Sequence, residues 1–233
     1  RQIKQGAMQE LLTGKKRLPG FCSEWLVKKL GEIAELDPEN LSSSTRPEYE
    51  FKYISLEDVD RGVLSGYSEQ IYKTSPSRAR RVLKQRDILV STVRPNLKSH
   101  LLFNIFDTDW ICSTGFSVLR CNPKKSMPEY VYYHLFSGGI ERQIETMTAG
   151  SNYPAINSGD VRGLEILIPE IDEQRAISRI LIEMDSELSY LTAQLNKNKA
   201  IKQGMMQELL NGRTRLVDVE NHHVKEERMQ GTL

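Results

Sequence analysis

A sixteen-residue segment occurs twice in the chain. Residues 3–18 read IKQGAMQELLTGKKRL and residues 201–216 read IKQGMMQELLNGRTRL, so twelve of the sixteen positions are identical. Apolar residues recur at i, i+4 and i+8 in both copies, and Thr-Gly or Asn-Gly then provides a left-handed C-cap. Each copy therefore predicts the end of a helix. The offset of 198 residues has the size of a domain, which indicates a duplicated unit rather than a solenoid repeat.

The first copy has no helix start in front of it. Residues 1–18 are therefore expected to be the C-terminal end of a preceding repeat helix. The remainder of that helix would be missing from the chain by truncation, or it would lie on another molecule.

The residues before the second copy predict one long helix. Pro169 suits a first helical turn, acids follow it, and lysines collect near the other end, in agreement with the helix macrodipole. Residues 169–210 would form a rod of roughly 60 Å at 1.5 Å per residue. Apolar residues at spacings of four and three, typical of a coiled-coil seam that ends on a polar position, are Ile177, Leu181, Met184, Leu188, Leu191, Leu195 and Asn198.

Two interpretations of this helix remain open. It could pack as an amphipathic helix on its own domain, or it could pair with another long helix as an antiparallel coiled coil. The narrow seam and the length favour pairing, which makes residues 169–212 a spacer and dimerisation helix. A polar tail, residues 213–233, gives no functional signal.

Residues 19–168 form a unit of ordinary domain size with mixed periodicity. Residues 25–34 predict a short helix or turn, and residues 40–47 a loop. Further strands are predicted at 49–54, 87–93, 110–113, 115–120 and 164–168, and helices at 128–136 and 140–147. The predicted fold class is α+β, a globular mixed domain followed by a long helix.

Charge is distributed unevenly along the chain. Between Lys73 and Lys98, eight basic residues stand against one acid, Asp87, so this window carries +7 and the rest of the chain −6, for a net charge of +1. An acidic pole lies between Glu165 and Tyr190, where seven acids stand against two arginines. The basic window predicts contact with a polyanion.

Composition excludes several other classes. At 39% hydrophobic and 27% charged residues the chain has material for a sizeable core, and it contains no run of eighteen apolar residues and no signal-peptide pattern. Cys22, Cys112 and Cys121 show no C-x-x-C spacing, so we expect ordinary thiols, no metal site and a cytoplasmic location.

Four motifs occur in a fixed order between the repeats. They are Gly20-Phe21 with Trp25 and Leu30-Gly31-Glu32-Ile33, then Gln85 to Pro95, then Gly150 to Asn157, and finally Pro169 to Ile177. In this order, together with the repeated helix end, they resemble the specificity subunit of type I restriction–modification systems. The resemblance covers nearly the whole chain.

The resemblance implies a non-catalytic role. Such a subunit normally carries two target recognition domains, each followed by a long spacer helix, so the chain resembles a C-terminal half or a half-length subunit that dimerises. Residues 19–168 would read one half of a bipartite site in double-stranded DNA. Methyltransferase subunits, and a restriction subunit, would supply S-adenosylmethionine, Mg and ATP chemistry. The chain itself lacks an Asp/Asn-Pro-Pro-Tyr motif and a phosphate-binding loop, so no cofactor is expected on it.

Candidate DNA contacts follow from side-chain chemistry. Arginine and asparagine have paired hydrogen-bonding groups for guanine or adenine edges, and a proline stiffens the loop that carries them. The residues predicted to contact bases are Thr92, Arg94, Asn96 and Asn152. Those predicted to contact phosphate are Lys73, Arg78, Arg80, Arg81, Lys84, Lys98, Ser151 and Tyr153. For these basic residues a solvated face is the alternative, and for residues 151–153 it is a self-bonded polar turn.

Two alternative functions remain open from the sequence. Glu50 and Lys52 on one strand face, with Asp37 upstream, have the residue types of a metal-dependent nuclease, although an ordinary ion pair explains them as well. A coiled-coil assembly protein without sequence-specific DNA binding is the second. That function would not explain why positive charge is concentrated in one window.

Overall fold

The computed structural model describes residues 2–149 and 154–213. The chain divides into two compact units, residues 1–184 and residues 185–233. Of the elements in the described residues, the first unit holds the strands and the short helices, together with the start of the long helix α6 (Ile171–Leu210). The second unit holds the rest of that helix.

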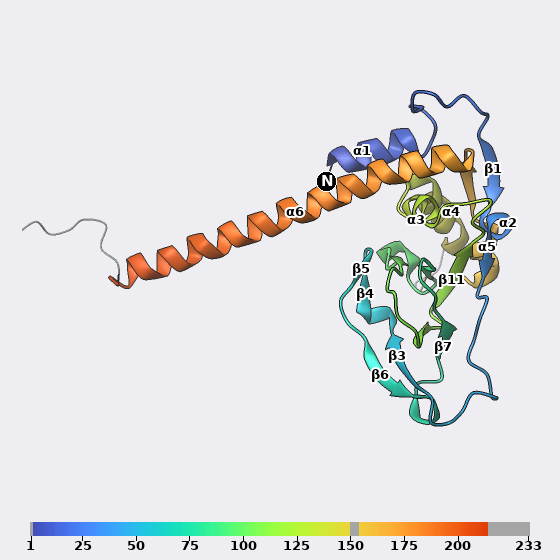
Figure 1. Ribbon diagram of the computed structural model, residues 1–233, viewed down its shortest axis with the longest axis horizontal. Helices are drawn as coiled ribbons and strands as arrows, with labels where there is room; N and C mark the ends of the chain where they lie inside the picture. Colours follow the sequence, from blue (N-terminus) through green and yellow to red (C-terminus); the bar gives the residue numbers. More distant parts are fainter. Residues whose placement is uncertain (1, 150–153, 214–233) are drawn as a thin grey trace, which may run out of the picture. The chain divides into compact units, whose positions relative to one another are not determined.

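Two four-stranded sheets form the centre of the first unit (Figure 1). One has the order β6-β3-β10-β7, in which β3 and β10 run parallel and the other pairs antiparallel; its strands are β3 (Glu50–Ile54), β6 (Ser68–Ile71), β7 (Ala79–Val82) and β10 (Trp110–Ser113). The other is antiparallel with the order β2-β11-β8-β9; its strands are β2 (Ala34–Leu36), β8 (Ile88–Ser91), β9 (Leu101–Leu102) and β11 (Phe116–Cys121). A short hairpin joins β4 (Val59–Asp60) to β5 (Val63–Leu64).

The alternation of side chains along the strands decides how the layers pack. In β8, Ile88 and Val90 face a large core shared with the helices, whereas Leu89 faces the core between the sheets. In β10, Trp110 points into that second core and Ile111 into a smaller outer cluster. Other layers of the fold cover both faces of each central strand. The side chains on both faces are therefore apolar.

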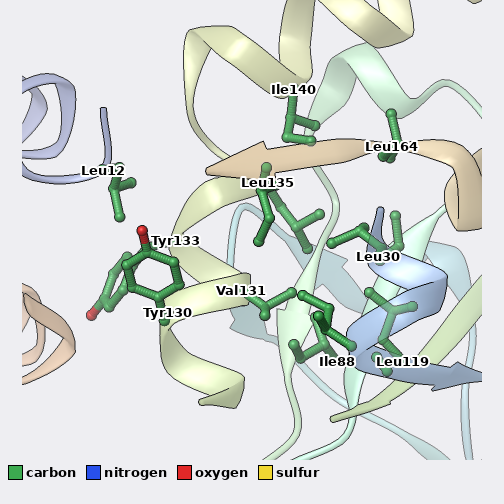
Figure 2. Packing of buried hydrophobic residues seen from close by; sticks show 14 of the residues in the cluster. Leu12, Leu30, Ile88, Leu119, Tyr130, Val131, Tyr133, Leu135, Ile140 and Leu164 are labelled. Atoms are coloured by element: carbon green, nitrogen blue, oxygen red, sulfur yellow. The ribbon is translucent and has the colours of Figure 1, made fainter. Parts of the chain in front are cut away.

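The helices cover the outer face of the antiparallel sheet. They are α2 (Leu30–Ile33), α3 (Pro128–His134), α4 (Gly138–Thr148) and α5 (Ser158–Gly163), joined by the antiparallel pair β1 (Leu26–Lys29) and β12 (Glu165–Ile168). Figure 2 shows Val131 of α3 and Leu135, directly after that helix, in this core with Leu30 and Leu164, whereas Tyr130 lies on the side of Leu12. Three 3-10 turns complete the unit: η1 (Leu56–Asp58), η2 (Tyr72–Thr74) and η3 (Pro95–Leu97).

The first copy of the repeat forms α1 (Gln2–Leu11), which lies beside the start of α6 and runs in the opposite direction (Figure 1). Met8, Leu11 and Leu12 share the main core with Ile177 and Leu181 of α6. Both copies of the repeat end as predicted, since Gly14 and Gly212 adopt left-handed φ angles of 68° and 66°. No helix in the described residues is long and apolar enough to cross a membrane.

Most predicted elements are confirmed, but one prediction was half wrong. Residues 25–34 contain a strand, β1, before the four-residue helix α2, because Leu26 to Lys29 pair with β12. The sequence also gave no sign of the short strands β4 to β7 and β9. The pairing that makes them strands comes from residues distant in the chain.

Candidate nucleic-acid interface

The loop that follows β8 comprises residues 92–98. Its first residues form backbone hydrogen bonds with other segments of the fold. The backbone amide of Thr92 donates to Gly115 O at 2.9 Å, the Arg94 amide donates to Pro154 O at 2.8 Å, and the Ile156 amide donates to Thr92 O at 2.9 Å. Residues 154–156 therefore run along this loop. The loop and residues 154–156 are adjacent in the fold, although Val93 and Ala155, which form an isolated β-bridge, are 62 positions apart in the sequence.

The conformation of the loop is unusual. Arg94 and Lys98 flank η3 with left-handed φ angles of 48° and 58°, a region that residues other than glycine rarely adopt. Pro95 is buried between them, and the Ser91 hydroxyl donates to Val93 O at 2.8 Å. This backbone leaves Arg94 and Asn96 exposed at the surface. The exposed side chains are thus held on a backbone that the surrounding structure fixes.

Thr92 has a different role from the one predicted. Its side chain is buried, and its hydroxyl donates to Gly115 O at 2.8 Å. Because the hydroxyl is engaged inside the fold, Thr92 supports the loop rather than facing a ligand. Asn152, Ser151 and Tyr153 lie outside the described residues.

A third segment joins this surface. The Thr114 amide donates to Arg78 O at 2.8 Å, and Gly115 accepts from Thr92, so Arg78, Thr114 and the loop are neighbours. The side chains of Arg78 and Thr114 are exposed. Thr114 was not predicted, because a threonine in the tight turn between two strands carries no signal for nucleic acid in the sequence. This surface, residues 78, 114, 94 and 96, is called the loop surface below.

The basic window carries less unpaired charge than its sequence suggests. Four of its eight basic residues form ion pairs with acids from elsewhere in the chain. The pairs are Arg81–Asp37 at 3.0 Å, Lys84–Glu39, Arg86–Glu129 at 2.6 Å and Lys98–Glu141 at 3.0 Å. Glu39, Glu129 and Glu141 lie outside residues 73–98. A count of the charges within that window therefore misses the ion pairs that they form.

Arg81 is the clearest correction among the predicted phosphate contacts. Its side chain is only 19% exposed, with one nitrogen donating to Asn40 Oδ1 at 3.0 Å and another paired with Asp37. Asp37 also accepts from the Val118 amide at 2.8 Å and from the Ser158 hydroxyl at 2.5 Å. Arg81 therefore ties β7 to β11 and α5.

Three predicted phosphate contacts keep their charge available. Within residues 2–149 and 154–213, no carboxylate lies within ion-pair distance of Lys73, Arg78 or Arg80. The Arg80 guanidinium lies over the Tyr72 ring at 5.1 Å, and the Tyr72 hydroxyl donates to Ser42 O at 2.8 Å. These residues extend the positive surface from the loop surface toward η2.

The buried polar groups behind the interface fix the strands that carry it. Asp87, which is 1% exposed, accepts from Arg120 Nε at 2.9 Å and Nη2 at 2.7 Å. The hydrogen bond to Asp87 raises the pKa of Arg120, with burial acting against it. A hydrogen bond from Lys84 lowers the pKa of Glu39, which Arg120 also contacts. Arg120 and Glu39 therefore stay charged at neutral pH.

A buried histidine supports the base of the loop. His100 is fully buried, its Nδ1 accepts the Ser91 amide at 3.1 Å, and its ring meets Phe136 edge-on at 5.6 Å between centroids. Burial lowers the pKa of His100 to about 4, and Lys98 adds to the effect. The ring is neutral at pH 7, as an acceptor at Nδ1 requires.

The residues proposed for a nuclease are not assembled into a metal site. Asp37 is engaged by Arg81, Val118 and Ser158, whereas Lys52 pairs with Asp107 and lies over Trp110 at 5.4 Å. The bond to Asp107 raises the pKa of Lys52. No group of three or more His, Cys, Asp or Glu residues in the part of the chain that the structure describes could hold a metal ion.

The predicted seam of α6 lies in two environments. Ile177 and Leu181 are buried and Met184 packs against the main core. Further along, Leu191 and Leu195 are 50% and 53% exposed, and Asn198 is exposed. Among the residues that the structure describes, other residues cover the first part of the seam, and Leu191 and Leu195 are half exposed.

An α+β domain with exposed basic residues is followed in this chain by a long helix with an apolar seam. The model of the type I restriction modification DNA specificity domain matches residues 22–203, and the chain belongs to this family.

Curated relatives agree with this assignment. The chain is 24% identical over 177 residues to the type I restriction enzyme HindI specificity subunit of Haemophilus influenzae, which covers 75% of this chain and 38% of that protein. It is 25% identical over 199 residues to the putative type I restriction enzyme MjaX specificity subunit of Methanocaldococcus jannaschii, covering 80% of this chain and 45% of that protein. The chain thus spans less than half the length of these two relatives.

Solved structures show the same fold. The HsdS subunit from Thermoanaerobacter tengcongensis matches with 31% identity and a TM-score of 0.63, over 80% of this chain and 48% of that one. A chain from a structural study of complex assembly and conformational transition of the type I R-M system matches with 28% identity and a TM-score of 0.66, over 88% of this chain and 53% of that one.

Proposed function

We propose that the chain is a non-catalytic specificity component that reads one half of a bipartite target in duplex DNA. The observation that carries the proposal is the loop surface, in which Arg94 and Asn96 are exposed on a backbone held by Gly115 and Pro154. A loop whose conformation is already fixed loses little conformational entropy when it binds a ligand. Membership of the specificity-domain family supports the same function.

The interface would make two kinds of contact with DNA. Arg94 and Asn96 would meet base edges in the major groove, where a bidentate arginine or asparagine distinguishes bases. Lys73, Arg78 and Arg80 would meet phosphates, which give affinity and salt dependence without sequence information. Lys84 and Lys98, which are paired with Glu39 and Glu141, would contribute less than these three.

The catalytic groups would come from other subunits. Methyltransferase subunits would bring S-adenosylmethionine and the adenine chemistry, and a restriction subunit would bring Mg and ATP. The exposed side of α6, with Leu191 and Leu195 uncovered, is suited to another long helix, either of a second copy or of a modification subunit. Residues 169–212 would then set the spacing between two half-sites.

Selection from a random duplex library tests the proposal. The purified chain would be incubated with the library at two salt concentrations, first alone and then with the cognate methyltransferase subunit. We expect enrichment of a short half-site, or of two copies at a fixed spacing. The control is the variant Arg94→Ala, which should retain binding to DNA but lose the preference at one position.

If neither condition enriched a sequence although the chain still self-associated, sequence-specific binding would be rejected. The helix would then be the functional part of the protein, and a coiled-coil assembly role would replace DNA reading.

A further inference from the structure

Apolar side chains accompany the polar ones on the loop of residues 92–98. The loop exposes Val93, Arg94, Asn96 and Leu97, while Pro95 between them is buried. Val93 is 39% exposed and Leu97 is 52% exposed. Neither belongs to the hydrophobic clusters formed by the described residues. Two apolar groups therefore lie at the surface beside the two side chains that are proposed to read bases.

The backbone of the loop places Leu97 beside Arg94. The Leu97 amide donates to Arg94 O at 2.9 Å, and this hydrogen bond closes the 3-10 turn η3. Residues three positions apart in such a turn lie on the same side of it. A long apolar side chain and a guanidinium are thus presented together.

The other side of the turn is attached to the rest of the domain. The Lys98 amide donates to the carbonyl oxygen of the buried Pro95 at 2.9 Å, and the Lys98 ammonium pairs with Glu141 of α4 at 3.0 Å. Rotation of the turn to bury Leu97 would break these contacts. Leu97 therefore stays at the surface because the backbone under it is held in place.

The exposed apolar groups are continuous with the loop surface. Gly115 accepts hydrogen bonds from both the amide and the hydroxyl of Thr92, and its neighbour Thr114 is exposed. A single exposed leucine is common in folded proteins and needs no explanation. Leu97 differs because it is fixed on the surface that is proposed to enter the major groove of DNA.

We propose that Leu97, flanked by Val93, contacts the 5-methyl group of a thymine in the half-site. The inference rests on the proposed function and adds the base that the apolar part of the loop selects. Thymine is the one base of unmodified DNA that presents an apolar group in the major groove. A leucine gains from covering that methyl group and gains nothing comparable from the polar edges of the other bases.

The dimensions of the turn restrict where this thymine lies. A 3-10 helix rises about 2.0 Å per residue, so the three positions from Arg94 to Leu97 span about 6 Å. Successive bases of one strand are about 3.4 Å apart along the DNA axis. The thymine should therefore lie within about two base pairs of the position that Arg94 reads.

Replacement of thymine by uracil tests the contact, because the two bases differ only in the 5-methyl group. The half-site comes from the library selection, and the position that Arg94 reads is the one whose preference Arg94→Ala loses. Each thymine is then replaced singly by uracil, and binding of the full chain is titrated in the condition that enriched the half-site. One replacement, within about two base pairs of the Arg94 position, should weaken binding about fourfold, as expected for one buried methyl group.

Variants of Leu97 show whether the protein itself senses the methyl group. Leu97→Ala should bind the thymine and uracil duplexes equally, whereas Leu97→Met, which keeps a long apolar side chain, should retain most of the difference. Leu26→Ala is the matched control, because Leu26 is also a leucine with 52% exposure but lies on β1. It should keep the full fourfold effect. All three variants should unfold at the temperature of the unchanged chain, since the substituted side chains are half exposed.

Three results would overturn the proposal. A selected half-site without a thymine in that range is the first, and a thymine there whose replacement by uracil has no effect is the second. The third is a uracil effect of equal size in Leu97→Ala, which would mean that the methyl group acts through the shape of the DNA.

The failure of this contact can be told apart from the failure of the proposed function. An enriched half-site with any of these three results removes the methyl contact and leaves DNA reading intact. A library without enrichment rejects DNA reading, and the methyl contact with it.

Discussion

The edge strand β7 and the loop surface carry the same kind of side chain in opposite environments. Arg81 of β7 is held by Asp37 and Asn40, with 19% of its side chain exposed. Arg94 of the loop stands on a left-handed backbone at the surface. Both belong to one basic window of the sequence. The difference shows that acids distant in the sequence decide which basic residues of the window are held inside the fold.

The largest loss of stability is expected when the buried carboxylate of Asp87 is removed. In the chain, Asp87 lies between β7 and the loop of residues 92–98. Asp87→Ala leaves Arg120 and the Lys84 amide without their buried acceptor, and breaking a buried pair costs about 3–5 kcal/mol of unfolding free energy. Urea unfolding would measure it. As a matched control, Glu39→Ala removes the more exposed partner of Arg120 and should cost about 1 kcal/mol or less. Equal losses would show that the network is not the common support of both regions.

Acid should destabilise the fold through two buried histidines. Burial lowers the pKa of His100 to about 4 and that of His134 to about 3, so both stay neutral in the folded chain. The unfolded chain takes up these protons below about pH 6.5. The unfolding free energy should therefore fall as the pH drops from 6.5 to 5, by up to about 1.4 kcal/mol per pH unit for each histidine.

Urea unfolding across this pH range measures the slope. His100→Asn keeps an acceptor for the Ser91 amide but does not titrate, so it should reduce the slope by up to half. An unchanged slope in this variant would mean that His100 is not protonated on unfolding.

Arg94→Ala should change which bases are read with little effect on stability. Loss of one bidentate contact is expected to reduce discrimination at one position by about 1–3 kcal/mol. Arg81→Ala should show the reverse pattern, a loss of about 1–3 kcal/mol in unfolding free energy with the base preference unchanged. Library selection and urea unfolding of both variants would check this. An equal loss of affinity for every sequence in Arg94→Ala would make that residue a phosphate contact.

The smallest effect is expected at the unpaired basic residues. Arg80→Ala should weaken binding to all sequences and flatten the salt dependence of log K by about one unit. Lys84→Ala is the matched control, because Lys84 is already paired with Glu39 and should change the slope less. Titrations at four salt concentrations would measure both slopes, and a larger change in Lys84→Ala would contradict the division between paired and unpaired residues.

Some parts of the site were predictable and others were not. The loop at residues 92–98 could be found because arginine, proline and asparagine lie together after an apolar strand. Thr114 could not be found, because only the pairing of β8 with β11 brings Gly115 next to Thr92. The burial of Thr92 and Arg81 could not be predicted from the sequence either, because it depends on acceptors that are distant along the chain.

The local features of the protein could be predicted from the sequence alone. The helix ends, the long helix and its seam, and the main strands follow from periodicity and from capping residues, which act over a few neighbouring positions. Which charges are neutralised, and where the first copy of the repeat packs, could be seen only in the folded chain. Those outcomes depend on contacts between Arg17 and Glu173, or between Arg81 and Asp37, that form only when distant segments pack together.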